Sequence, residues 1–240
     1  MAELIGLRAD VIVAYPTTAG IAVHQQTTEI PLVVYGGDLE ATKLVASLAR
    51  PGGNVTGVSG ATAELATKNL ELIVEMLPAV RRVAVLVNAD SLFGAALLEH
   101  VQAAADLRKI EIKSVLIRES DRLDAVVLSL DQWQPDALLL HPALPLKMIA
   151  ALALNRRLPT VSPNSSFCEA GGLVSYSPDI EALASQCATF VDKILRGRKP
   201  SDLPVELPTR TRLRVNLKTA RAIGLSIPPT LLGRADEVIE

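Results

Sequence analysis

The chain has 240 residues, of which 49% are hydrophobic, so it is long enough to bury a substantial core. Its 24 Lys and Arg against 26 Asp and Glu give a net charge of −2, and the scattered basic residues exclude the positive stripe of a nucleic-acid-binding surface. Aromatic residues make up only 3% of the chain, too few for the base-stacking platforms of single-strand binders.

Short apolar runs alternate with segments of helical period, which is typical of a parallel sheet covered by helices, so the fold class is α/β. The expected strands are, in chain order, residues 10–14, 31–35, 55–58, 82–87, 111–117, 136–140, 160–162 and 173–176. The expected helices are residues 18–26, 40–49, 63–77, 92–109, 122–132, 146–156 and 180–195. Residues 200–240 contain five prolines and are expected to form an extended return segment and a wrapped tail rather than another βα unit.

The sequence shows no membrane span, because no apolar run reaches the roughly 20 residues that a bilayer requires. The first residues lack the charged leader and apolar core of a signal peptide. Cys168 and Cys187 match no metal-ligand spacing and are interpreted as inert buried thiols. His24 and His100 are interpreted as helix-surface residues, so we expect neither a metal nor a cofactor.

Polar residues follow the expected strands at their carboxyl ends, where parallel α/β sheets bind ligands. These stretches are residues 15–18, 36–38, 59–60, 88–91, 141–142 and 163–166. Their hydroxyls, amides and backbone N–H groups suit a carboxylate or another small polar ligand. The same residue types are ordinary helix caps, so the sequence leaves both roles open. His141 ends an apolar strand at this edge, and the sequence leaves open whether it lines a pocket.

Catalytic motifs are not found, and no catalytic residue is predicted. Residues 57–61, Gly-Val-Ser-Gly-Ala, lack the second glycine of a G-x-S-x-G nucleophile elbow in its required place. Neither phosphate-binding glycine motif occurs, which argues against a nucleotide cofactor. Because a fold alone does not decide function, an enzyme on the same doubly wound fold stays open as an alternative, as does a cytosolic ligand sensor.

Three segments together carry a resemblance to a known family. They are residues 44–57, Leu-Val-Ala-Ser-Leu-Ala-Arg-Pro-Gly-Gly-Asn-Val-Thr-Gly; residues 169–176, Glu-Ala-Gly-Gly-Leu-Val-Ser-Tyr; and the tail, residues 215–225 with 227–229 and 234–239. With them the chain resembles the ABC transporter substrate-binding proteins of the group that includes tryptophan- and tyrosine-binding lipoproteins. The resemblance covers almost the whole chain.

The resemblance implies a type I periplasmic-binding fold, with two Rossmann-like lobes whose parallel sheets are joined by a three-segment hinge. The first lobe would hold residues 1–58 and 178–203, and the second residues 60–176 and 204–240, with crossings near Ser59, Tyr176 and Pro204. Family members usually begin with a further strand–helix–strand–helix unit behind a signal sequence. We therefore expect the first lobe to be incomplete, with an exposed sheet edge. Ser177 stands where the family often has glycine.

The function that the resemblance implies is capture of an amino acid or a small organic anion between the lobes, in the periplasm, and its delivery to an ABC permease in the membrane. No covalent chemistry is required. In the first lobe, Thr17 and Thr18 would bind a carboxylate at a helix start, and Asp38 would pair with an amine. The other predicted ligand-binding residues are Asn88, His141 and Asn164 in the second lobe and Tyr176 at the hinge.

Overall fold

The computed structural model of the chain describes residues 6–7, 9–60 and 62–240. The chain divides into two compact units, each assembled from segments that are distant in sequence. Unit 1 comprises Met1–Thr62 and Pro178–Arg210, and unit 2 comprises Ala63–Ser177 and Thr211–Glu240. The chain therefore passes from one unit to the other three times. The lobe boundaries expected from the sequence stay a prediction.

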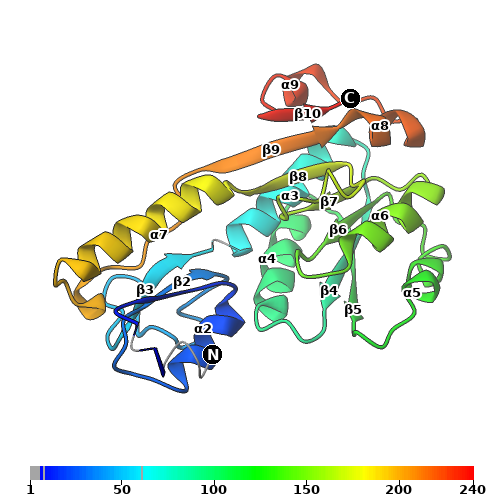
Figure 1. Cartoon of the computed structure of the whole chain (residues 1–240). Helices are drawn as coiled ribbons and strands as arrows, with labels where there is room; N and C mark the ends of the chain where they lie inside the picture. The colour runs from blue at the N-terminus through cyan, green and yellow to red at the C-terminus, as the bar shows by residue number, and fades with distance from the viewer. Residues whose placement is uncertain (1–5, 8, 61) are drawn as a thin grey trace. The chain divides into compact units, whose positions relative to one another are not determined.

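Unit 1 is built on a three-stranded parallel sheet in the order β1-β2-β3, formed by Ile12–Ala14, Leu32–Gly36 and Val55–Ser59 (Figure 1). The central strand β2 is apolar at successive positions because both of its faces are covered. Leu32 and Val34 share a core cluster with Val23 of helix α2, which spans Thr17–His24. Val33 points to the opposite face and packs with Phe190 of helix α7, Ile180–Leu195.

The helix expected over residues 40–49 does not form, and this prediction was wrong. The segment is a series of turns in which Lys43 has a left-handed φ of 59°. The hydroxyl of Thr42 donates to the carbonyls of Asp38 and Leu39, which competes with helical backbone bonding. The turns bury apolar side chains of this segment in the core of unit 1, and that burial outweighs a weak helix propensity.

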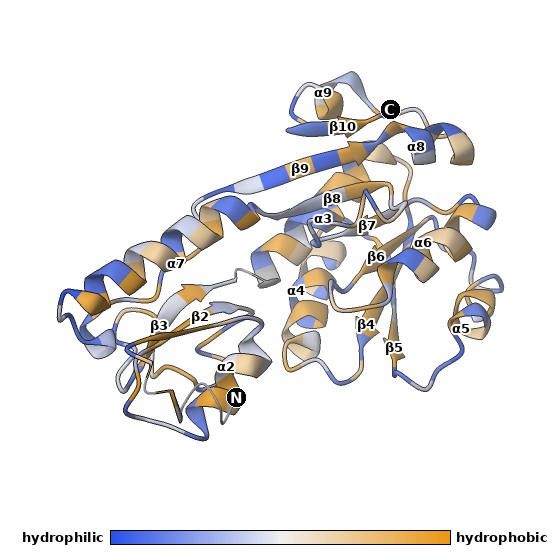
Figure 2. Cartoon of the chain, viewed as in Figure 1, coloured by the Kyte–Doolittle hydropathy of each residue, from blue (hydrophilic) through white to orange (hydrophobic). Residues whose placement is uncertain are grey.

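Unit 2 contains a seven-stranded sheet in the order β10-β9-β8-β7-β6-β4-β5. Its strands are β4 (Arg82–Asn88), β5 (Glu111–Ile117), β6 (Ala137–Leu140), β7 (Thr160–Ser162), β8 (Val174–Pro178), β9 (Thr211–Asn216) and β10 (Glu237–Ile239). Its helices are α3 (Thr62–Met76), α4 (Gly94–Asp106), α5 (Leu123–Ser129), α6 (Leu146–Asn155), α8 (Leu217–Ile223) and α9 (Pro229–Leu232). Figure 2 shows that β6 and the middle of β4 are hydrophobic, as strands covered on both faces are.

Helices cover both faces of this sheet, and the strand order reverses at β4. Val85 and Val87 of β4 share a core cluster with residues of α3 and α4, whereas Ala84 and Leu86 share one with residues of α5 and α6. The chain leaves β4 for β5 on one side and then returns to place β6 on the other side. The carboxyl ends of β4 and β6 therefore flank a topological switch point, where open α/β sheets form their ligand crevice.

The C-terminal tail is more regular than the sequence analysis expected, and that expectation was wrong. Residues 211–239 form β9, α8, α9 and β10, and β10 pairs in parallel with β9, so they make a further βα unit of the sheet. Leu213 and Val215 of β9 face the core, while Arg212 and Arg214 alternate with them. Asn216 caps α8, since its side chain accepts the N–H of Thr219 at 3.0 Å.

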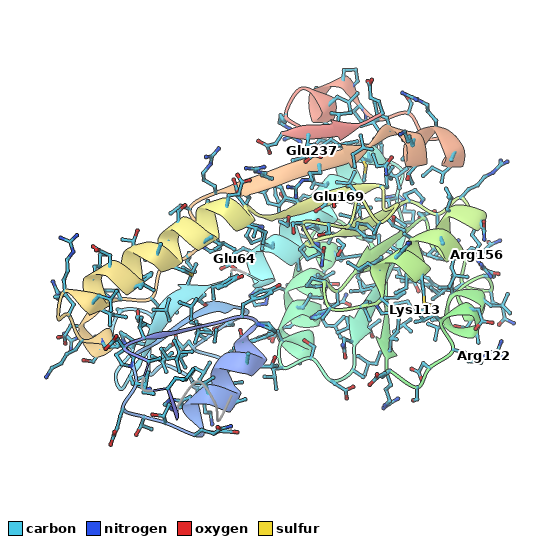
Figure 3. The ribbon with its side chains drawn as sticks, in the orientation of Figure 1. Glu64, Lys113, Arg122, Arg156, Glu169 and Glu237 are labelled. Atoms are coloured by element: carbon cyan, nitrogen blue, oxygen red, sulfur yellow. The ribbon has the colours of Figure 1, made fainter. Side chains whose placement is uncertain are left out.

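Charged side chains lie at the outer edges of unit 2, as Arg122 directly before α5 and Arg156 directly after α6 show (Figure 3). Arg122 pairs with Asp124 at 2.7 Å, and Arg156 pairs with Asp131 at 3.0 Å. Exposed pairs of this kind contribute little to stability. Among the described residues, no helix is both long enough and apolar enough to cross a membrane.

Candidate functional site

In unit 1, the structure brings Thr17, Thr18 and Asp38 to the loops that follow β1 and β2. Thr17 and Thr18 are the first two residues of α2, whose N-cap position is Pro16 and carries no side-chain cap. Thr17 is only 1% exposed, and its Oγ1 has no hydrogen-bond partner among the described residues. Thr18 is exposed. A buried hydroxyl without a partner is costly, so the Thr17 hydroxyl lowers the stability of this strand end unless a partner reaches it.

Gly36 is the residue that lets α2 start so close to β2. A Cβ atom on Gly36 would lie 2.2 Å from Oγ1 and 2.7 Å from the backbone nitrogen of Thr17, well inside van der Waals contact. Gly36 is also in register with Ser59 of β3, so it cannot shift freely. The close approach of strand and helix therefore requires glycine at this position.

Asp38 acts as a turn cap in this structure. Its Oδ1 accepts the backbone N–H groups of Glu40 and Ala41, both at 3.0 Å. The side chain is half-buried, and its pairing with a ligand amine stays a prediction.

In unit 2, the structure brings Asn88, His141 and Asn164 together at the switch point. All three bond to the loop that follows β6: Asn88 Nδ2 donates to the carbonyl of Ala143 at 3.5 Å, and Asn164 Nδ2 to that of Pro142 at 3.0 Å. The two asparagine Oδ1 atoms accept the N–H of Asp90 and Ser166. Both asparagines thus cap their own loops, and their ligand-binding role stays a prediction.

His141 is 4% exposed, and its two ring nitrogens have different partners. Nδ1 accepts the backbone N–H of Ala143 at 3.2 Å, so the proton of the neutral ring is on Nε2. Nε2 lies 2.9 Å from Oγ of Ser91, which follows β4, and it therefore donates to that oxygen. Burial lowers the pKa of His141 to about 4, so the ring is neutral at neutral pH. This contact joins the two sides of the switch point.

The Ser91–His141 contact does not have the arrangement of an activated nucleophile. In a serine hydrolase, the imidazole accepts the serine proton at Nε2, and a carboxylate accepts the proton on Nδ1. Here Nδ1 accepts from a backbone N–H, and Nε2 donates to the hydroxyl. The low pKa of His141 also makes the ring a weak base.

Ser91 was inside one of the polar stretches noted in the sequence but was not among the predicted ligand-binding residues. Only the contact with His141 singles it out, and that contact joins loops that are 50 residues apart. Its position directly after a strand end was the available sequence signal.

A groove of about 1030 Å³ opens beside the switch point in unit 2. Asn88, Asp90 and Ala143 line it together with Ile117 at the end of β5 and Leu123 at the start of α5. The lining combines apolar side chains from the start of α6 with charged ones that follow β5, among them Arg118, Glu119 and Asp121. A small-molecule site usually combines an apolar lining with a few polar groups, and this groove is more polar than that.

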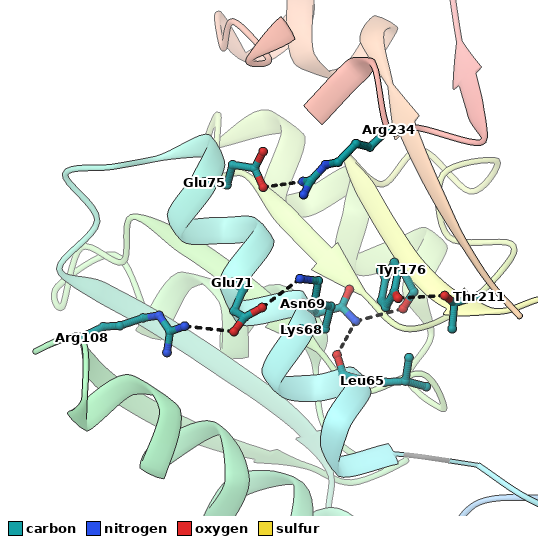
Figure 4. Close-up of polar contacts among 9 residues, drawn as sticks. All are labelled: Leu65, Lys68, Asn69, Glu71, Glu75, Arg108, Tyr176, Thr211 and Arg234. Atoms are coloured by element: carbon teal, nitrogen blue, oxygen red, sulfur yellow. Dashed lines mark hydrogen bonds and ion pairs between the residues drawn. The ribbon is translucent and has the colours of Figure 1, made fainter. Parts of the chain in front are cut away.

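Tyr176 lies apart from the other predicted residues of unit 2, between α3 and β9 (Figure 4). Its hydroxyl is 2.8 Å from Oγ1 of Thr211, and its carbonyl accepts Nδ2 of the buried Asn69 at 3.0 Å. The ring is half-buried, and a ligand contact of Tyr176 stays a prediction. The neighbouring Ser177 is buried in β8 without a left-handed φ, so the backbone there does not require glycine.

The described residues contain no group of three or more His, Cys, Asp or Glu side chains arranged to hold a metal ion. Cys168 and Cys187 are buried free thiols, and burial raises their pKa values to about 12 and about 11. Such thiols are poor nucleophiles and poor metal ligands.

Comparison with known proteins places this geometry in a family. The chain is 23% identical over 224 residues to a tyrosine-binding protein of Clostridioides difficile. The alignment covers 91% of this chain and 64% of that protein, so the chain spans less than two thirds of this relative. A crystal structure of a conserved domain protein from Vibrio cholerae superposes with a TM-score of 0.88 at 26% identity over 98% of this chain and 80% of that chain.

Two further structures show the same fold at lower identity. An ABC domain from Streptococcus pneumoniae in complex with L-Trp has a TM-score of 0.85 at 24% identity, covering 96% of this chain and 81% of that chain. A Thermotoga maritima leucine-binding protein has a TM-score of 0.58 at 16% identity, covering 85% and 62%. The fold is thus that of the type I periplasmic-binding proteins. A family model described as "ABC transporter substrate binding protein" matches residues 1–239, and the chain belongs to that family.

Proposed function

We propose that the chain is the solute receptor of an ABC-type importer. It works outside the cytoplasm, where it binds an amino acid or a similar small organic anion through polar groups at the strand ends of its two units. It then delivers that ligand to a permease in the membrane. The observation that carries the proposal is the family match over residues 1–239. The strand-end donors support it, since hydroxyl and N–H groups suit a carboxylate.

In unit 1, Thr17 and Thr18 bind the ligand carboxylate in this proposal, and Asp38 pairs with the amine. Thr18 is exposed at the start of α2, whereas the buried Thr17 hydroxyl has no partner and would meet a ligand oxygen only if its surroundings shift. In unit 2, Asn88, His141 and Asn164 shape the strand-end face, and Tyr176 sits close to where the chain passes between the units. No step of this function requires covalent chemistry.

A ligand screen tests the proposal directly. The intact chain is titrated by calorimetry with L-tryptophan, L-tyrosine, L-leucine and benzoate, with D-ribose as a neutral comparison. A bound ligand at a hundredfold excess over its dissociation constant stabilises the folded chain by about 2.7 kcal/mol, which a thermal melt detects. If none of the four acids binds and none stabilises the chain, the proposed ligand class is wrong.

Replacement of Thr17 by Val separates ligand binding from folding. Val keeps the shape of Thr but removes the hydroxyl, so we expect about 1.5–3 kcal/mol less affinity for a carboxylate ligand. Stability is expected to stay equal or to rise, because the lost hydroxyl has no partner. Thr189→Val on the exposed part of α7 is the matched control. An unchanged affinity in Thr17→Val would show that Thr17 is only structural.

A further inference from the structure

The hydroxyl of Ser91 has a defined direction in this structure. Its Oγ accepts two hydrogen bonds, one from Nε2–H of His141 at 2.9 Å and one from the backbone N–H of Phe93 at 3.2 Å. A serine oxygen has two acceptor positions and one proton. With both acceptor positions occupied by the protein, Ser91 can take part in a further hydrogen bond only as a donor.

The direction of these bonds depends on the ring of His141. The N–H of Ala143 occupies Nδ1, so a neutral ring must carry its proton on Nε2 and donate to Ser91. The ring is buried and stays neutral at neutral pH. His141 therefore acts as a positioning residue for the Ser91 hydroxyl.

Ser91 is half-buried, and the groove of about 1030 Å³ is lined by its neighbours Asn88 and Asp90 and by Ala143. Ser91 itself is not among the lining residues, but it directly follows Asp90, which borders the space in which a ligand could lie. Asp90 is exposed and therefore screened by solvent, whereas the start of α4 lies three residues after Ser91 and contributes the positive end of its dipole.

We propose that Ser91 is a specificity-determining residue that donates a hydrogen bond to a carboxylate of the ligand. This inference rests on the proposed function, since it assumes that the strand-end face of unit 2 meets the ligand. It adds to that function a ligand-contacting residue, Ser91, and a criterion for which ligands bind. Ligands that present an acceptor to Ser91 bind, and matched ligands that present only a donor are rejected, because the Ser91 oxygen has no acceptor position left.

The test uses the histidine ring as a reporter and acetate as the probe. His24, His100 and His141 are the only histidines of the chain, so a His141→Gln variant assigns the His141 signals in a ¹H–¹⁵N NMR spectrum of the imidazole rings. We expect the Nε2–H tautomer and a saturable shift of the His141 signals as acetate is added. Methylammonium, which offers only donors, is expected to cause none.

Three variants of the full chain complete the design. Ser91→Ala is expected to weaken acetate binding by roughly tenfold or more, Ser91→Thr to retain it, and Ser185→Ala, an exposed serine of α7, to leave it unchanged. An Nδ1–H tautomer, an absent acetate response, or an equal response in Ser91→Ala overturns the inference. Failure of the amino-acid screen with an intact acetate response would reject the proposed function alone, whereas amino-acid binding that is indifferent to Ser91→Ala would reject this inference alone.

Discussion

Gly36→Ala is expected to destabilise unit 1 and to displace the start of α2. The new Cβ would lie 2.2 Å from Oγ1, 2.7 Å from the nitrogen and 3.3 Å from Cα of Thr17. At least two of these atoms must therefore move by about 1 Å. Gly36 lies in the central strand of a three-stranded sheet and is in register with Ser59, so the helix must move instead of the strand.

The cost follows from this geometry. Overpacking of a well-packed site costs about 1–3 kcal/mol, and contact with a backbone atom places this site at the upper end, about 2–3 kcal/mol. For a chain of this size, the melting temperature would fall by roughly 5–10 °C. Affinity for a carboxylate ligand is expected to fall as well, because Thr17 moves with the helix.

Urea unfolding and thermal melts of the intact chain, Gly36→Ala and Gly233→Ala provide the comparison. Gly233 has an ordinary φ of −66°, and its nearest atom to a new Cβ is 3.4 Å away, so its replacement is expected to have little effect. Equal melting temperatures for Gly36→Ala and the intact chain would refute the reasoning, because they would require a packing around Gly36 looser than the structure shows.

Three further predictions concern unit 2. Asn69→Ala removes the bond to the Tyr176 carbonyl and is expected to cost about 1–3 kcal/mol in urea unfolding, whereas Glu75→Ala, which removes a surface ion pair, should cost less than about 1 kcal/mol. The pKa of His141 is lowered from 6.5 to about 4, so its stabilising contribution is complete above about pH 6.5 and is lost as the pH falls toward 4. The free energy of unfolding should fall by about 3 kcal/mol over this pH range. The urea midpoint of His141→Gln should not show this pH-dependent decrease. Finally, the intact chain should hydrolyse p-nitrophenyl acetate no faster than Ser91→Ala, and a faster rate that depends on Ser91 would favour an enzyme.

The strands were predictable from sequence because buried parallel strands are short, β-branched and apolar on both faces. Seven of the predicted runs lie within about two residues of β1 to β7, and the eighth overlaps β8. The predicted helix over residues 40–49 failed because hydrogen bonds from Thr42 and burial of Leu44 and Val45 decided the local structure. Neither effect is visible in helical periodicity.

The C-terminal strand β9 failed to be predicted for a different reason. Its alternation of Arg212, Leu213, Arg214 and Val215 has the period of a strand. The nearby prolines favour turns and extended loops, and this second signal led to the wrong prediction. At the site, strand ends could be located from sequence, and the meeting of Asn88, His141 and Asn164 at one loop agrees with their shared edge. The direction of the Ser91 hydroxyl could not be predicted, because it depends on a backbone N–H from another loop.

The interleaved order of the two units has a consequence for biosynthesis. Val33 and Val58 of unit 1 are covered by Leu183, Phe190 and Ile194 of α7, which leave the ribosome only after most of unit 2 has been made. At a synthesis rate of 5–20 residues per second, the roughly 135 residues between Val58 and Ile194 take about 7–30 seconds. During that interval one apolar face of the unit 1 sheet remains exposed to water. Chaperones can therefore bind this face on the nascent chain, whereas α7 covers it in the folded protein.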